Sequence, residues 1–319
     1  MKEFSRAEIE LSIIIVNWNT KEFLIQCLQS INKNIQNIKY EVYVVDNASS
    51  DGSPNAVERQ FPYVKLIRNK INLGFAAANN IAINQCSGRY ICLINSDILI
   101  LPFCIENLFS FMEKHSEVGI VSPRILDTDR TLQPNWRWFP SFRRDICRAL
   151  ALDRFFPKSP FYFRMIPYSL RHDSCRKVEV LTGCFWMVRR EAIVRVGLLD
   201  ENFFMYGEDI DWCRRFHDAG WGVIYNPGAE AIHYGEASSS KDPIKFYLEM
   251  QKSRLYYWQK YYGKLRKNFY LIIILFSQIL RIIIRFLFYG FYPPGRKTAM
   301  PKIRRSIECI KWIMNKHIA

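Results

Sequence analysis

The sequence lacks the patterns that mark several common protein classes. Its nine cysteines include no Cys-x-x-Cys pair and several lie inside apolar runs, which argues against a zinc or disulfide framework and favours a reducing, cytoplasmic location. It has no G-x-x-x-x-G-K-[ST] loop and no G-x-G-x-x-G turn, so a phosphate-loop ATPase or a dinucleotide-binding protein is not indicated. It shows no internal repeat, and the short apolar run at 11–16 is too short for the apolar region of a signal peptide.

Acidic residues are scarce near the C-terminus. The 319 residues carry a net charge of +15, but residues 241–319 contain 17 Lys and Arg against three acids, which leaves the first three quarters nearly neutral. A basic C-terminal appendage is therefore a better interpretation than a whole-protein nucleic-acid binder, and we expect no nucleic-acid partner. Since 49% of all residues are hydrophobic, the chain can bury a large core.

The first 115 residues alternate between short β-branched runs and helical patterns. Four apolar runs, each followed by a loop and a helical pattern, occupy residues 11–16, 41–45, 64–67 and 90–94. Such units predict a mostly parallel, doubly wound α/β sheet, with ligands at the carboxyl ends of its strands. Those ends carry Asn17, Asp46, Asn72 and Asp97. Each is an ordinary turn former by itself, but four in register favour a site.

Two of these loops suit a nucleotide. Asp46 stands just past a strand, in Val-Val-Asp-Asn-Ala-Ser-Ser-Asp-Gly-Ser, where a carboxylate can accept a hydrogen bond from a pyrimidine ring N–H. The next loop, 68–76, opens a helix with Gly74 and small residues, and the free N–H groups of such a helix start suit a ribose or phosphate.

Two further segments suit a diphosphate and a proton transfer. Asp97, with Asn95 as a weaker neutral neighbour, fits the one or two carboxylates that hold Mg²⁺ or Mn²⁺ on phosphate oxygens. His233 is a candidate further ligand, more natural for Mn²⁺, although a structural role for it stays open. Three acids follow Gly207 within four positions, and one of them could be a general base unless they simply favour a helix N-terminus. They are Glu208, Asp209 and Asp211.

Taken together, six motifs in this order resemble glycosyltransferase family 2, especially its bacterial rhamnosyltransferase-like branch, over roughly residues 10–260. The motifs are Ser-Ile-Ile-Ile-Val-Asn-Trp-Asn from Ser12, Val-Asp-Asn-Ala-Ser-Ser-Asp-Gly-Ser from Val45, Asn-Leu-Gly-Phe from Asn72, Asn-Ser-Asp from Asn95, Thr-Gly-Cys-Phe-Trp-Met-Val-Arg-Arg from Thr182 and Gly-Glu-Asp-Ile-Asp from Gly207.

The resemblance implies a GT-A fold and an inverting, metal-dependent transfer from a nucleotide-diphosphate sugar. It implies that Asp46 reads the base, Asp97 and His233 hold Mg²⁺ or Mn²⁺, and Asp209 is the catalytic base, while Asn95 replaces the first acid of the family's D-x-D. The other donor-binding candidates are Asn17, Asn47, Asn72, Gly74, Asn95 and Ser96, and the supporting candidates are Gly183, Glu208, Asp211 and Arg214.

The expected organisation is a catalytic domain at 1–260, with a nucleotide-binding half at 1–122 and an acceptor-binding half at 123–260, followed by basic helices at 261–319. Residues 123–177 form a basic, aromatic-rich stretch that could bind acceptor, face a membrane or only pack.

Residues 269–292 are apolar and long enough to span a bilayer, but Arg281 and Arg285 near the middle favour a position in the membrane interface. Packing on the catalytic domain or on a dimer partner is the alternative. Flanking Lys and Arg suit an anionic leaflet.

We therefore expect an inverting glycosyltransferase at the cytoplasmic face of the membrane, peripheral or monotopic. It would transfer a rhamnose-like sugar from a dTDP- or UDP-sugar to a lipid-linked or polysaccharide acceptor. The alternative is a non-catalytic membrane-associated scaffold that keeps the fold.

Overall fold

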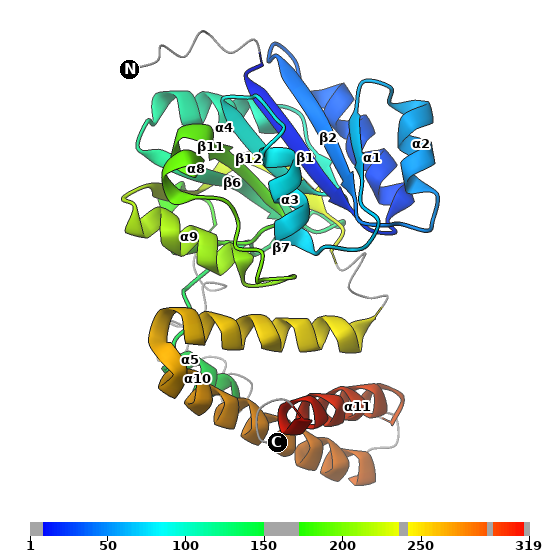
Figure 1. Ribbon diagram of the computed structural model, residues 1–319, viewed down its shortest axis with the longest axis vertical. Helices are drawn as coiled ribbons and strands as arrows, with labels where there is room; N and C mark the ends of the chain where they lie inside the picture. Colours follow the sequence, from blue (N-terminus) through cyan, green and yellow to red (C-terminus); the bar gives the residue numbers. More distant parts are fainter. Residues whose placement is uncertain (1–8, 150–171, 236–241, 292–295, 316–319) are drawn as a thin grey trace. The chain divides into compact units, whose positions relative to one another are not determined.

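The computed structural model describes residues 9–149, 172–235, 242–291 and 296–315, without the side chains of 148–149, 288–291 and 296–299 (Figure 1). They form two compact units: a larger one of Met1–Phe139 and Pro167–Ser240, and a smaller one of Pro140–Ile166 and Lys241–Ala319. The expected boundary at 260/261 lies close to the kink at Gly263 in α10 (Pro243–Phe291), and α10 belongs to the smaller unit. Residues 150–171, which hold many aromatics of the basic stretch, lie outside the described residues.

The larger unit is built on one mixed sheet. Its strands are β1 (Leu11–Asn17), β2 (Tyr40–Asp46), β3 (Lys65–Arg68), β4 (Tyr90–Asn95), β5 (Ile98–Ile100), β6 (Val118–Leu126), β7 (Leu132–Gln133), β9 (Arg176–Lys177), β11 (Phe185–Arg189) and β12 (Gly222–His233). The main order is β3-β2-β1-β4-β11-β6-β12-β5. Strands β1 to β4 pair in parallel, as do β6 and β12, whereas β11 and β5 run antiparallel to their neighbours. The predicted mostly parallel α/β sheet is confirmed.

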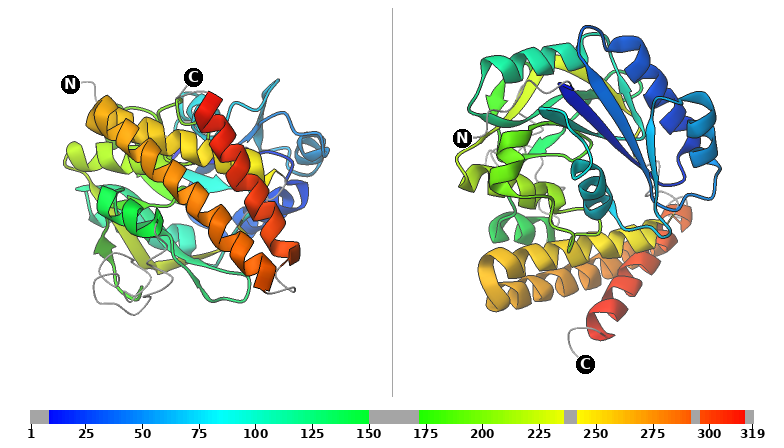
Figure 2. Two further views of the ribbon diagram at one scale, coloured as in Figure 1. Left: turned by 90° about the horizontal axis from the view of Figure 1, so that it is seen from below. Right: turned by 45° about the horizontal axis from the view of Figure 1, so that its top comes forward.

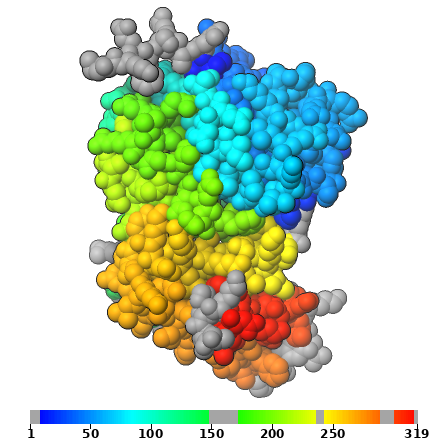
Figure 3. Space-filling view, viewed as in Figure 1, coloured from blue at the N-terminus to red at the C-terminus, as the bar shows by residue number. Residues whose placement is uncertain are grey.

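Helices cover both faces of this sheet, as the right-hand view of Figure 2 shows. They are α1 (Lys21–Asn34), α2 (Ser53–Gln60), α3 (Phe75–Ile83), α4 (Cys104–Lys114), α8 (Arg190–Val196) and α9 (Glu208–Asp218). On the face of the molecule seen in Figure 3, the surface of the first strand-helix units (blue to cyan) adjoins that of α8 and α9 (green).

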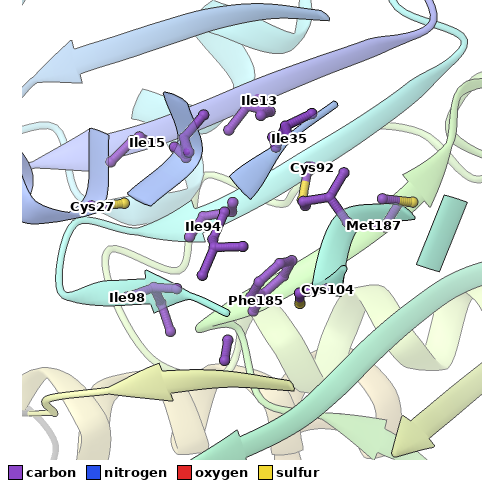
Figure 4. Close-up of a cluster of buried hydrophobic side chains, with 14 of the residues drawn as sticks. Ile13, Ile15, Cys27, Ile35, Cys92, Ile94, Ile98, Cys104, Phe185 and Met187 are labelled. Carbon is purple, nitrogen blue, oxygen red and sulfur yellow. The ribbon is translucent and has the colours of Figure 1, made fainter. Parts of the chain in front are cut away.

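The core of the larger unit has two layers, one on each face of the sheet, because successive side chains of a strand point to opposite faces. Ile13 and Ile15 join the first buried cluster, which includes side chains of α1 and α4 (Figure 4). Ile14, between them, joins the second cluster with side chains of α3, α8 and α9. Burial on both faces is why these strands read as nearly continuous apolar runs.

The smaller unit is helical within the described residues and consists of α5 (Phe142–Ala149), α10 and α11 (Arg296–Ile313). Gly263 has φ +81° and divides α10 into two limbs. The limbs fold back on each other, since Trp258 lies 5.6 Å from Tyr270 between ring centroids and Tyr247 accepts a hydrogen bond from Arg281. Phe142 of α5 stacks on Trp258 at 4.0 Å.

Candidate functional site

Asn17 joins the carboxyl ends of β1 and β2, where it pairs in register with Asp46. Its side chain is fully buried, and Nδ2 donates to Asp46 Oδ1 at 2.8 Å and to Ser53 Oγ at 2.7 Å. Its Oδ1 accepts a hydrogen bond from Thr20 Oγ1 at 2.8 Å. The amide of Asn17 is thus used within the protein, which makes Asn17 a positioning residue for Asp46.

Asp46 is buried and held at both oxygens. Oδ1 accepts from Asn17, and Oδ2 accepts the backbone N–H of Ser49 at 2.9 Å. An ionised carboxylate has about four acceptor positions, so each oxygen can accept a further hydrogen bond. This geometry suits the reading of a ring N–H.

Asn47 and Gly74 connect the end of β2 to the start of α3. Asn47 Nδ2 donates to Gly74 O at 3.0 Å and its Oδ1 accepts from Asn69 Nδ2 at 2.8 Å. The N–H of Gly74 donates to Asn72 Oδ1 at 2.9 Å. Gly74 has φ +85°, and a Cβ on it would lie 2.2 Å from the carbonyl oxygen of Phe204, so only glycine fits this close approach.

Asp97 and His233 meet although they are far apart in the sequence. Asp97 lies in the tight turn between β4 and β5, and β5 pairs with the end of β12 so that Ile98 stands opposite His233. His233 Nε2 is consequently 3.3 Å from Asp97 Oδ1 and 3.5 Å from Asn95 Nδ2. The backbone N–H of Tyr234 donates to Asp97 O at 3.0 Å and holds the two segments together.

Gln133 and Asp127 orient His233, and the sequence-based prediction missed both. Gln133 Nε2 donates to Asp127 Oδ1 at 2.6 Å, so its Oε1 is the atom that accepts from His233 Nδ1 at 2.6 Å. This network places a proton on Nδ1, so in the neutral form of the imidazole the lone pair of His233 Nε2 faces the Asp97 carboxylate. A short turn followed by Gln133 gives no sequence signal for this contact, because it depends on β7 pairing with β6.

This pair of donors fits a divalent cation. An imidazole nitrogen and a carboxylate oxygen are a donor set that suits Mn²⁺ better than Mg²⁺, and an outer hydrogen bond to the histidine is usual at such sites. Across the described ranges no three His, Cys, Asp or Glu side chains form a complete ligand group. A cation held here would therefore need further ligands besides these side chains, as is common for Mg²⁺.

Two contacts connect the parts of the site. Ser96 Oγ is 2.7 Å from Thr20 Oγ1, which continues the hydrogen-bond chain from Asn17 to the turn that carries Asp97. The backbone N–H of Asn95 donates to Cys184 O at 2.9 Å, and a Cβ on the adjacent Gly183 would lie 3.7 Å from Oε1 of Glu208, the neighbour of Asp209. Burial above all, together with the charges of Asp97 and Asp209, raises the pKa of the Cys184 thiol to about 12. Both carboxylates therefore lie in the same region of the larger unit.

Asp209 is in the first turn of α9, which begins after Gly207 at φ +92°. Its Oδ1 accepts the backbone N–H of Ile210 at 2.8 Å, and its Oδ2 is 2.5 Å from Nη2 of Arg137. Arg137 belongs to β8 (Trp136–Arg137), which pairs with β10 (Val180–Leu181). Asp209 is nearly buried whereas Arg137 is about one third exposed, so the arginine is the accessible member of this pair. The role of Arg137 was not predicted from the sequence.

The supporting candidates occupy different positions. Asp211 is fully buried and its Oδ2 accepts from Arg215 Nε at 2.9 Å, and Arg215 also donates to the carbonyl oxygens of Val196 and Leu198, so this pair anchors α9 to the end of α8. Arg214 is half-buried on the same helix. Gly183 lies close to Glu208, since a Cβ added to it would be 3.7 Å from Glu208 Oε1.

Glu208 is a buried acid beside the candidate base. Burial raises the pKa of Glu208 from 4.5 to about 8, and the charge of Asp209 adds to this effect. Its Oε2 is buried without a hydrogen-bond partner among the described residues. Glu208 is therefore mostly in its neutral form at pH 7.

The raised pKa of Glu208 makes the stability of the protein depend on pH. Below about pH 4.5 the group is protonated in both states, but between about pH 5 and pH 8 the unfolded chain ionises first, so the free energy of unfolding falls as pH rises. We expect Glu208→Gln to remove this fall and to stabilise the protein at pH 8 by on the order of 4 kcal/mol, the equivalent of the pKa shift. Urea unfolding of both proteins at pH 5 and pH 8 measures it, and an equal pH dependence in the two would contradict it.

Comparison with known proteins identifies the kind of molecule that carries this site. Residues 12–197 match the family described as Glycosyl transferase family 2. An N-acetylglucosaminyl-diphospho-decaprenol L-rhamnosyltransferase of Mycobacterium tuberculosis is 30% identical over 254 residues, which cover 76% of this chain and 82% of that protein. Rhamnosyltransferase WbbL of Escherichia coli is 26% identical over 232 residues, 70% of this chain and 82% of that protein.

Solved structures agree on the fold. A mannosyltransferase from Pyrobaculum calidifontis, solved in complex with GDP-Man and Mn²⁺, superposes with a TM-score of 0.54 at 16% identity and covers 95% of this chain and 87% of its own. GalNAc-T7, solved with UDP, GalNAc and Mn²⁺, gives a TM-score of 0.53 at 16% identity over 72% of this chain and 44% of its own. Both are similar to this chain in the GT-A arrangement of the sheet.

Proposed function

Since the chain belongs to glycosyltransferase family 2, we propose that it transfers a sugar, with inversion, from a nucleotide-diphosphate donor to a hydroxyl of a lipid-linked or growing cell-surface polysaccharide. The names of the two relatives favour a rhamnose-like sugar. The observation that carries the proposal is the facing pair of Asp97 Oδ1 and His233 Nε2 at 3.3 Å, in the same region as the buried carboxylate of Asp209.

In the proposed reaction, Asp209 takes the proton of an acceptor hydroxyl while that oxygen attacks the anomeric carbon. One in-line displacement opposite the departing nucleoside diphosphate inverts this carbon. Arg137 fixes the carboxylate of Asp209 through Oδ2, and the N–H of Ile210 fixes it through Oδ1. A divalent cation held by Asp97 and His233 would supply positive charge to the leaving diphosphate.

The donor is proposed to bind at the carboxyl ends of β1 to β4. Asp46 would read the pyrimidine of a dTDP- or UDP-sugar, while Asn72 and Gly74 at the start of α3 and the Asn95-Ser96 turn would contact ribose and phosphates. Residues 1–122 would thus be the nucleotide-binding half and 123–260 the acceptor-binding half.

An enzyme with a lipid-linked acceptor must act at the membrane that holds this acceptor. We therefore propose that the protein is peripheral or monotopic at the cytoplasmic face. In the described part of the chain, the helix at Pro243–Leu287 is long and apolar enough to cross a membrane, by length and composition. The flanking Lys and Arg suit an anionic surface.

A panel of nucleotide sugars tests the proposed function. Purified full-length protein is mixed with dTDP-, UDP- and GDP-sugars, with Mn²⁺, with Mg²⁺ or with EDTA, and released nucleoside diphosphate is measured. We expect turnover of a dTDP- or UDP-sugar that EDTA abolishes. If no donor is turned over and none raises the melting temperature in Mn²⁺, the proposal fails and the non-catalytic scaffold is favoured instead.

A further inference from the structure

The second limb of α10, residues 264–291, has two chemically different faces. From Phe269 to Leu287 every residue classed as exposed is large and apolar. Steps of three and four place most of them along one side of a helix. We call this set the apolar row: Phe269, Ile272, Phe276, Ile279, Ile283 and Phe286.

Between Phe269 and Leu287, the polar side chains Ser277, Gln278, Arg281 and Arg285 are on the opposite, packed face. Ser277 and Gln278 are buried. Arg281 Nη1 donates to the hydroxyl of Tyr247 at 3.3 Å, and Arg285 Nη1 donates to a backbone carbonyl of α11 at 3.1 Å. The two arginines that interrupt the apolar run in the sequence therefore do not interrupt the apolar row.

The neighbouring helix α11 limits how deeply the second limb of α10 can insert into a membrane. Residues from both α10 and α11 form one buried cluster, and the left-hand view of Figure 2 shows the second limb (orange) and α11 (red) side by side. Positions 300, 304, 307 and 311 of α11, and position 314 directly after it, are exposed and alternate between Met or Ile and Arg or Lys. Such a helix suits the interface between headgroups and acyl chains, whereas immersing its cations in hydrocarbon is costly.

Charge decides between lipid and a second copy of the chain as the partner of the apolar row. Spacing in steps of three and four would also suit a coiled coil. However, residues 241–319 carry 17 Lys and Arg against three acids, so two copies would repel each other while an anionic surface attracts them.

We infer that the second limb of α10 lies in the plane of an anionic membrane surface, with the apolar row inserted among the acyl chains and both ends of the limb on the same side. The segment 269–287 could span the bilayer, lie on it or pack on the protein, and this inference selects the second of these positions. It rests on the proposed function for the presence of a membrane, but not on catalysis.

Vesicle flotation in the absence of donor and metal tests the apolar row. The full chain is compared with Ile272→Glu/Ile279→Glu and with Ile71→Glu, a control in the larger unit whose exposure of 64% matches the 62% of Ile272. We expect the double variant to lose roughly tenfold or more of its binding to phosphatidylcholine vesicles that contain phosphatidylglycerol, with the control unchanged. Unchanged flotation of the double variant, or loss of a dimer without loss of flotation, overturns the inference.

Labelling separates an in-plane limb from a spanning one. Lys264→Cys and Lys302→Cys, both at exposed positions, are made with Cys175→Ser, since Cys175 is the exposed cysteine of the described residues. A membrane-impermeant maleimide added to sealed membranes should modify both sites in the same orientation. Modification from opposite sides shows a spanning helix and overturns the inference, yet leaves donor turnover as a separate result.

Discussion

Asp209→Asn is expected to lower the kcat of sugar transfer by roughly 10²–10⁴-fold, the usual contribution of a general base. Asparagine has the same shape and keeps an oxygen for Arg137, but its amide cannot take a proton from an alcohol. The affinity for nucleoside diphosphate should change little, because the proposed donor contacts are at Asp46 and Asp97. Initial rates with saturating donor, and a thermal-shift titration with the nucleoside diphosphate, measure the two quantities.

Two variants of the same helix control for structural damage. Asp218→Asn makes the same replacement at an exposed position near the C-terminal end of α9, and Glu208→Gln replaces an acid that is already neutral at pH 7. Both should keep kcat within about threefold of the native protein, a difference below 1 kcal/mol in the barrier. A kcat of Asp209→Asn within the same range would show that Asp209 is not the base.

The sheet of the larger unit was predictable because its strands are buried on both faces. Apolar β-branched runs such as Leu11–Asn17 and Tyr90–Asn95 carry the signal in every residue, and the polar residues that stop them mark the strand ends. Asn17 was predicted as a donor contact, but its buried amide is used to hold Asp46, a distinction that requires the hydrogen-bond partners.

The contacts of Asp97 and Asp209 depend on strands that are too short to show a periodic pattern in the sequence. β5 has three residues and β8 has two, yet β5 brings Asp97 to His233 and β8 brings Arg137 to Asp209. Pairing between segments so distant in the sequence is decided by tertiary packing, so a motif can indicate Asp97 and Asp209 but not their neighbours Gln133 and Arg137.

The arrangement of the C-terminal helices also depends on tertiary contacts that the sequence does not reveal. Composition predicted an apolar, basic appendage, but the direction of Arg281 and Arg285 depends on the turn at Gly263, which folds the second limb of α10 back on the first. A lone glycine in a long helical pattern is ambiguous, because it costs a helix only about 1 kcal/mol and need not end it.

Asp97→Asn should abolish metal-dependent donor binding. The amide lacks the negative charge that balances a divalent cation, so we expect the affinity for Mn²⁺, measured by electron paramagnetic resonance in the presence of nucleoside diphosphate, to fall by about 100-fold or more. Gln133→Leu keeps both Asp97 and His233 but removes the acceptor that holds the Nδ1 proton of the histidine. Its affinity should fall by roughly 10–100-fold, as for other residues that orient a ligand.

The order of these two effects distinguishes a cation site from a simple Asp97–His233 ion pair. In an ion pair the histidine is protonated at both nitrogens, and loss of Gln133 would change protein stability without changing Mn²⁺ affinity. Asp129→Asn is the matched control, since Asp129 lies in the same turn as Asp127 but is exposed, and its Oδ1 accepts from the backbone N–H and the hydroxyl of the nearby Thr131. Equal Mn²⁺ affinity in Gln133→Leu and Asp129→Asn would contradict the orienting role of Gln133, and undiminished affinity in Asp97→Asn would place the cation elsewhere.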